Sequence, residues 1–187
     1  MLKGLFVTLG AASIAIAGPA VAAESVAADA VTTLAPNTFV WQDDASIEPV
    51  SIVISINDQR AYVYRGETMI AVSSVSTGKD GNDTPTGTFP ILQKATTHRS
   101  NLYASAPMPF MQRLTWDGVA IHAGRNPGFP ASHGCIRVPT AFARKLFAAT
   151  NVGTQVIVTE GSQRYGFMVP GIAYPAIEVD TALANQF

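Results

Sequence analysis

The sequence predicts a mainly β domain with one main α-helix at about residues 140–149. Three observations predict this fold class. Apolar residues alternate with a period of two early in the chain, short segments rich in β-branched residues are separated by turn residues, and one later stretch repeats apolar residues at helical spacing. The 187 residues suffice for one domain with a core and terminal extensions, but not for two large domains.

Three short strands open the predicted domain. Residues 50–56 alternate in character, so that one face carries Val50, Ile52, Ile54 and Ile56. Turn residues lead to a second strand at 61–64 and to a third at 68–76. Such a meander of short strands is typical of an antiparallel sheet.

The middle of the chain is less regular. Residues 77–87 are rich in glycine and contain a proline, which predicts a loop, and 88–92 form another strand. Residues 93–114 show no clear period. Residues 118–122 form a short apolar strand that ends in His122.

The predicted helix at 140–149 begins at Thr140, a suitable N-cap residue. Its apolar stripe has helical spacing and consists of Phe142, Ala143, Leu146 and Phe147. A last strand at 154–159 closes the core, and the pattern weakens beyond it. We therefore treat residues 161–187 as a C-terminal extension.

The N-terminus predicts a signal peptide over residues 1–22. An apolar run follows Lys3, Gly18 and Pro19 break it, and the small residues at 20–22 suit cleavage. The alternative is an uncut membrane-anchoring helix, although the run is short for that purpose. We expect an exported chain, in the periplasm or cell wall after cleavage.

Residues 23–47, rich in Ala, Ser, Thr and Asp, are predicted to be a linker. No later stretch is long and uncharged enough to span a bilayer, so the mature chain is expected to have no transmembrane segment. Charge is nearly balanced, with 12 Lys and Arg against 13 Asp and Glu. This balance argues against a duplex nucleic-acid binder, which normally has a basic face.

Cys135 is the only cysteine, so an exported chain cannot use it for an internal disulfide. It lies in the sequence Ser-His-Gly-Cys-Ile-Arg, within a loop rich in glycine and proline, with His133 two residues before it and His122 upstream. A thiol becomes a nucleophile when a neighbouring base creates its thiolate. Gly134 allows close approach of the backbone to a substrate. A small, buried and inert cysteine is the alternative.

The segment IHAGRNPGFPASHGCIRVP, residues 121–139, resembles the active-site signature of the L,D-transpeptidase catalytic domain. Residues 52–89 resemble the opening half of that domain, 108–110 the segment before the catalytic strand, and 152–158 the closing strand. The resemblance implies a catalytic domain over 48–160. It also implies a mixed β-sandwich of the L,D-transpeptidase catalytic type.

The resemblance implies a role for each residue of the signature. Cys135 would attack the carbonyl between an L-centre diamino acid and the D-alanine of a peptidoglycan stem peptide. His122 would be the base and acid, oriented by the carbonyl of Ala123. The backbone N–H groups of Gly134 and Cys135 would form the oxyanion hole. D-alanine leaves, and an amine on an acceptor peptide resolves the thioester; no metal or cofactor is required.

Three further residues, Ser132, His133 and Arg137, would shape the substrate pocket, with Arg137 pairing with a substrate carboxylate. His98 matches no family role and is assigned to the surface. Only nine residues separate His122 from Ser132, toward the short end of the family, so we expect a shortened loop over the donor site.

Two other functions remain open at this stage. Water in place of the amine would make the enzyme an L,D-carboxypeptidase or hydrolase, and a non-catalytic wall-binding module would keep the fold alone. The acceptor also remains open: a stem peptide, an outer-membrane protein and a D-amino acid all use the same acyl-enzyme.

Overall fold

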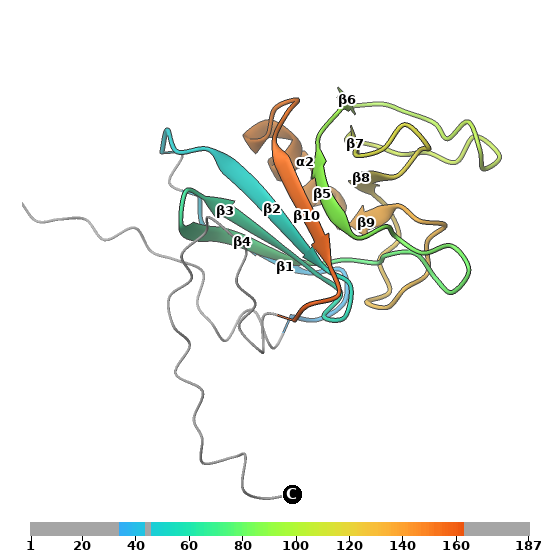
Figure 1. The fold of residues 1–187 in the computed structure, drawn as a ribbon, viewed down its shortest axis with the longest axis horizontal. Coiled ribbons are helices and arrows are strands. Elements are labelled where there is room, and N and C mark those ends of the chain that lie inside the picture. The colour runs from blue at the N-terminus through green and yellow to red at the C-terminus, as the bar shows by residue number, and fades with distance from the viewer. Residues whose placement is uncertain (1–33, 44–45, 163–187) are drawn as a thin grey trace, which may run out of the picture.

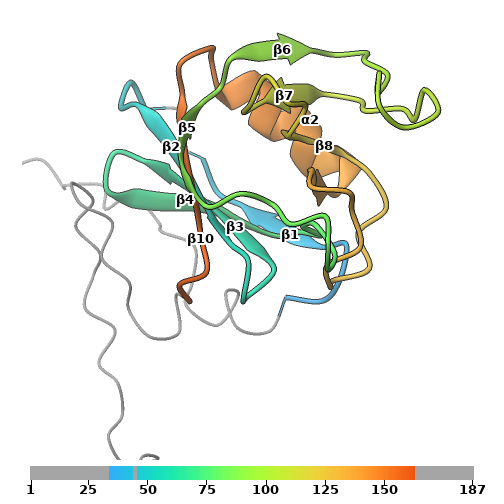
Figure 2. The same ribbon diagram turned by 45° about the vertical axis from the view of Figure 1, so that its right-hand side comes forward.

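The computed structural model describes residues 34–43 and 46–162 (Figure 1). Their strands form one six-stranded and one four-stranded sheet. The helix α2 (Thr140–Ala149) lies between the two sheets in Figure 2. Its buried residues join a core to which both sheets contribute, including Ile54 from the larger sheet and Ile121 from the smaller one. The arrangement is the mainly β sandwich with one helix that the sequence predicts.

The six-stranded sheet is mixed. Its strands run in the order β1-β4-β3-β2-β10-β5. The predicted antiparallel meander is confirmed for β2 to β4, whereas β10 pairs with β2 in parallel. The strand bounds are β1 (Phe39–Trp41), β2 (Val50–Ser55), β3 (Arg60–Arg65), β4 (Thr68–Ser74), β5 (Gly87–Pro90) and β10 (Gln155–Thr159).

The period-two pattern of β2 is confirmed by its packing. Ile52 and Ile54 face the main core, with Val50 and Ile56 packed against it. Val53 points to the opposite face, where it packs with Tyr62, Tyr64 and Val72 in a second cluster. Both faces of this sheet therefore bury apolar side chains, and the sheet is a rigid support for the rest of the domain.

One predicted boundary is wrong. Strand β1 lies within residues 23–47, which the sequence analysis assigned to a linker. β1 pairs antiparallel with β4, and the rings of Phe39 and Trp41 each lie with their centroids 5.6 Å from that of Phe142 on α2. A strand of three residues is too short to show a period, and its stability comes from these aromatic contacts.

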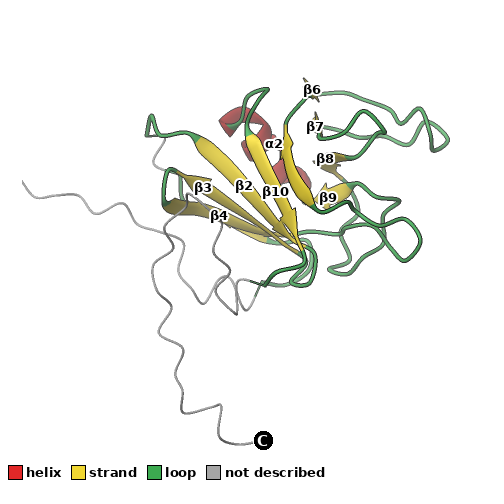
Figure 3. Ribbon diagram, viewed as in Figure 1, coloured by secondary structure: helices red, strands yellow, loops and turns green. Residues whose placement is uncertain are grey.

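The four-stranded sheet has the order β6-β7-β8-β9 and the bounds β6 (Gln93–Ala95), β7 (Met111–Arg113), β8 (Ala120–Ala123) and β9 (Ile136–Val138). Its strands are so short that residues 93–114 showed no period. The sequence analysis placed Ile136 and Arg137 in a loop, but they begin β9, which pairs in parallel with β8. Figure 3 shows long loops around this sheet.

Helix α2 has the bounds that the sequence predicts, but its N-cap differs. Thr140 is the first helical residue, Pro139 holds the cap position, and no side chain caps this end. At the other end, the Nζ of Lys94 donates to the carbonyl oxygens of Phe147 and Thr150, at 2.7 and 2.5 Å. A lysine on β6 thus satisfies carbonyls that the helix leaves unpaired.

The predicted signal peptide and most of the predicted C-terminal extension lie outside the described residues. Of the extension, residues 161 and 162 are described. The Ser55 hydroxyl donates to the carbonyl of Gly161 at 2.6 Å, and the Ser162 hydroxyl donates to Asp58 at 2.6 Å. No helix within 34–43 and 46–162 is long and apolar enough to cross a membrane.

Candidate active site

The pairing of β8 with β9 brings His122 and Cys135 to one face of the four-stranded sheet. Ile121 lies opposite Ile136, and both point into the main core. Because side chains alternate along a strand, the flanking residues point to the other face: His122 from β8, and Cys135 and Arg137 from the β9 side. There Cys135 packs against a small cluster that contains Met108, Met111 and Ala120.

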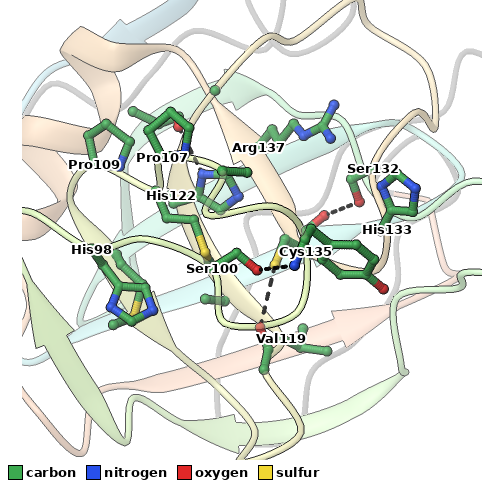
Figure 4. Close-up of a pocket in the computed structure, with 18 of the residues that line it drawn as sticks. His98, Ser100, Pro107, Pro109, Val119, His122, Ser132, His133, Cys135 and Arg137 are labelled. Carbon is green, nitrogen blue, oxygen red and sulfur yellow. Dashed lines mark hydrogen bonds between the residues drawn. The ribbon is translucent and has the colours of Figure 1, made fainter.

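A pocket of about 1460 Å³ opens on this face (Figure 4). It brings together six of the seven predicted site residues: Cys135, His122, Ala123, Ser132, His133 and Arg137. Gly134 does not line it. Among residues 34–43 and 46–162, no group of three or more His, Cys, Asp or Glu side chains is placed to hold a metal ion.

The Cys135 thiol is partly buried, and burial raises its pKa. A backbone hydrogen bond from Ala120 and the positive charges of Arg137 and Arg113 act in the opposite direction but are weaker. The sulfur lies 3.5 Å from the carbonyl oxygen of Gly118, to which a thiol proton donates. The raised pKa favours the protonated thiol, so a neighbouring base would be needed for the sulfur to become a nucleophile.

His122 is 7 % exposed, and burial lowers its pKa. The charges of Arg137 and His98 lower it further, whereas the hydrogen bond to Ala123 acts in the opposite direction. The Nδ1 atom lies 2.8 Å from the Ala123 carbonyl oxygen, the contact expected from the sequence. Because a carbonyl only accepts, Nδ1 carries the proton and Nε2 keeps a free lone pair. The lowered pKa and this contact favour a neutral ring with Nε2 unprotonated.

The backbone around Cys135 is held by two buried hydroxyls. The Ser132 hydroxyl accepts from the Gly134 N–H at 3.1 Å and donates to the Cys135 carbonyl at 2.5 Å. The Thr84 hydroxyl donates to the Gly134 carbonyl and accepts from the Gly78 N–H, at 2.9 and 2.8 Å. Gly134 has φ +107°, a conformation that favours glycine. The loop at 77–87 therefore fixes the conformation of the cysteine loop.

This geometry revises two expected roles. The Gly134 N–H is already hydrogen-bonded to Ser132, so it is not a free oxyanion donor. The Cys135 N–H, in contrast, has no hydrogen-bond partner among the described residues. Ser132 is fully buried, and its hydroxyl is hydrogen-bonded to the backbone of the cysteine loop.

The other two predicted pocket residues are placed differently. His133 is exposed, and its ring stacks on Tyr103 with centroids 4.7 Å apart. Arg137 lies opposite His122 in the sheet and is half-buried, and its Nη1 donates to the carbonyl of Ala131 at 3.3 Å. It presents a fixed positive charge close to the thiol.

The sequence analysis missed the β6–β7 side of the pocket. His98, assigned to the surface, is half-buried and lines the pocket, together with Arg113 and Trp116. These residues lie within or just after 93–114, where the strands are too short to show a period. Thr84 was also missed, although it lies in the Thr-Pro-Thr-Gly-Thr-Phe segment that resembles the family.

Comparison with known proteins agrees with this geometry. A family model for the L,D-transpeptidase catalytic domain matches residues 49–158. No protein of curated function matches the chain significantly.

Solved structures of similar fold include L,D-transpeptidases from two mycobacteria. The Mycobacterium smegmatis protein is 25 % identical with a TM-score of 0.55, over 59 % of this chain and 58 % of that one. The Mycobacterium tuberculosis H37Rv protein is 23 % identical with a TM-score of 0.57, over 59 % and 57 %. The predicted fold type is thereby confirmed.

A third similar structure is an L,D-transpeptidase in complex with imipenem, 26 % identical with a TM-score of 0.56, over 60 % of this chain and 59 % of that one. The chain therefore spans less than two thirds of the length of each of these three proteins.

Proposed function

Since this chain belongs to the family of L,D-transpeptidase catalytic domains, we propose that it is an exported enzyme that transfers acyl groups between peptidoglycan stem peptides. One observation carries the proposal. Cys135 and His122 line one pocket on one face of the sheet, and Ala123 holds the His122 ring with its free nitrogen available as a base.

In the acylation step, Nε2 of His122 takes the proton of the Cys135 thiol as the sulfur attacks. The target is the carbonyl carbon between the L-centre of the diamino acid and the D-alanine of a donor stem peptide. The Cys135 N–H donates to the oxyanion that forms. When the C–N bond breaks, His122 returns the proton to the amine of D-alanine, and a thioester on Cys135 remains.

In the transfer step, an acceptor amine attacks the thioester carbonyl. The new C–N bond forms as the C–S bond breaks, and one amine proton passes through His122 to the sulfur. Arg137 supports binding of a donor carboxylate, since its guanidinium is a fixed charge beside the thiol. Water as the acceptor would give a tripeptide product instead, the reaction of an L,D-carboxypeptidase.

Product analysis tests this function. The purified protein is incubated with tetrapeptide muropeptides, and the products are separated by chromatography and mass spectrometry. We expect a dimer joined between two diamino acids, together with released D-alanine. Tripeptide alone, even with added amine acceptors, would contradict transpeptidation and favour the hydrolase. No release of D-alanine at all would favour a non-catalytic wall-binding module.

A further inference from the structure

The residues that line the pocket lie on two sides of Cys135 and His122, called the β9 arm and the β6–β7 arm. On the β9 side it is lined by Arg137 and His133, and on the β6–β7 side by His98 and Arg113. In Figure 4, His98 and His133 lie on opposite sides of the labelled Cys135. A transfer enzyme binds two peptides at one sulfur, so two arms of one pocket match two substrates.

Hydrogen bonds to the 107–110 segment hold the backbone around His98. The N–H of Met108 donates to the His98 carbonyl at 2.9 Å, and the N–H of Phe110 donates to the Thr96 carbonyl at 3.0 Å. An isolated bridge between Arg99 and Pro107 continues this pairing. The His98 ring itself makes no hydrogen bond within the described part of the chain, although it is half-buried in the pocket. A pocket-lining imidazole whose nitrogens have no partner among the described residues is available to a ligand.

The charges of the pocket favour a neutral amine over an ammonium group. Arg113, Arg125 and Arg137 line the pocket, against one acid, Asp117. Because these positive charges repel another cation in a partly desolvated site, they lower the pKa of an amine that enters the pocket. The amine is therefore more readily uncharged there than in water. His98 lines the same pocket as Cys135 and His122, so an amine bound at His98 would lie in the cavity that holds the thioester.

The donor is assigned to the other arm. In the proposed reaction the donor peptide ends in the carboxylate of D-alanine, which suits Arg137, because its guanidinium is held by Ala131 and acts on the Cys135 thiol more strongly than Arg113 does. The β6–β7 arm is then left for the acceptor, which must bring an uncharged amine to the thioester.

We propose that His98 binds the acceptor amine and takes one proton from its ammonium form, a role that rests on the proposed transpeptidase function. The amine loses this first proton to His98. As nitrogen attacks the thioester and the C–S bond breaks, the second proton passes through His122 to the Cys135 sulfur. The third stays on the new amide, and His98 releases its proton to solvent. His98 is therefore an acceptor-binding residue that the acylation step does not require.

The test measures acylation and transfer separately in His98→Gln. Acylation by imipenem is followed by intact mass, and transfer from a tetrapeptide donor is followed with an amine-bearing stem peptide as acceptor. We expect transfer to fall about tenfold or more, while acylation changes by about twofold or less. Hydroxylamine, which is already uncharged at neutral pH, should restore near wild-type transfer in the variant.

Arg99→Gln is the matched control on the same ribbon, because Arg99 binds the Ser105 carbonyl but does not line the pocket. We expect both steps to be unchanged in this variant. Equal loss of acylation and transfer in His98→Gln would overturn the inference, as would equal loss with the peptide amine and with hydroxylamine. A wild-type protein that is not acylated would overturn the proposed function itself, a different outcome from these.

Discussion

At the scale of single residues, the Cys135 thiol and the His122 imidazole both rest uncharged. Burial raises the pKa of the thiol and lowers the pKa of the imidazole, and the Arg137 charge adds to the second effect. The pair is therefore not a preformed thiolate–imidazolium pair. In the proposed mechanism the proton moves to His122 during the attack, so we expect the orientation set by Ala123 to matter for the rate.

The lowered pKa of His122 predicts a shifted pH dependence. Acylation needs the unprotonated ring, and a lower pKa keeps the ring unprotonated to more acidic pH. As the pH is lowered, the acylation rate should therefore fall with a midpoint below pH 6.5, the ordinary pKa of histidine. The rate of imipenem adduct formation as a function of pH measures it. A fall centred above pH 6.5 would contradict the assigned state of His122.

The choice of base is tested by two histidine substitutions. His122→Ala should lower acylation by about 10²-fold or more, because it removes the pocket histidine whose ring is oriented by Ala123, whereas His98→Ala should change it by about twofold. The measurement is the single-turnover rate of adduct formation. Comparable losses in the two variants would mean that His98 also serves the acylation step.

At the scale of elements, two sets of polar contacts join segments that are distant in the sequence. Lys94 on β6 binds the C-terminal carbonyls of α2, and its Nζ lies 4.3 Å above the ring of Phe147. Thr84 joins the 77–87 loop to Gly134, next to the nucleophile. The first contact joins the four-stranded sheet to α2, and the second joins the loop between β4 and β5 to the loop that precedes β9.

Lys94→Met should destabilise the protein by about 1–2 kcal/mol, since it leaves helix carbonyls without charge-assisted partners. The urea midpoint should fall with an unchanged slope. Lys79→Met is the control: Lys79 is exposed on the surface, so its substitution should change stability by less than about 0.5 kcal/mol. Equal effects of the two substitutions would remove the proposed role of Lys94 at the helix end.

Thr84→Val should lower both stability and acylation. The substitution leaves the Gly134 carbonyl and the Gly78 N–H without their buried partner, at a cost of about 1–3 kcal/mol. It also frees the backbone that positions the Cys135 N–H. Thr84→Ser keeps the hydroxyl and should retain acylation. Urea unfolding and adduct formation measure the two effects; full acylation in Thr84→Val would show that the contact is not needed for the site.

At the scale of the whole molecule, the sequence predicted the elements that are long enough to show a period. Strand β2 and helix α2 carry a periodic apolar pattern and were predicted with the residues that face the core, whereas β3 and β4 were predicted as short strands without an assigned face. Strands β1, β6, β7 and β9 have three residues each, and their stability comes from partners distant in sequence. No local pattern reveals such partners.

The candidate site shows the same limit. The motif around Cys135 and the orienting carbonyl of Ala123 were readable from the sequence. The position of His98 was not, because it depends on the pairing of its ribbon with Met108 and Phe110. The hydrogen bond from the Gly134 N–H to the Ser132 hydroxyl depends on a local turn, which the motif alone does not specify.

Export is a prediction about the whole chain. Peptidoglycan lies outside the cytoplasmic membrane, and residues 1–22 have the pattern of a cleaved signal peptide. The mature protein should therefore begin at Ala23 and appear in the fraction outside that membrane. N-terminal sequencing of the fractionated protein measures this. An intact Met1 in a cytoplasmic fraction would contradict export.

The central claim is that Cys135 forms the acyl-enzyme, and peptide mapping after reaction tests it most directly. The purified protein is mixed with a tetrapeptide donor, quenched at acidic pH and digested, and the fragment that contains residue 135 is analysed by mass spectrometry. The account predicts a tripeptide acyl group on Cys135, which is absent from Cys135→Ser and strongly reduced in His122→Ala. An unmodified Cys135 under conditions where D-alanine is released, or acylation elsewhere that persists in Cys135→Ser, would contradict it.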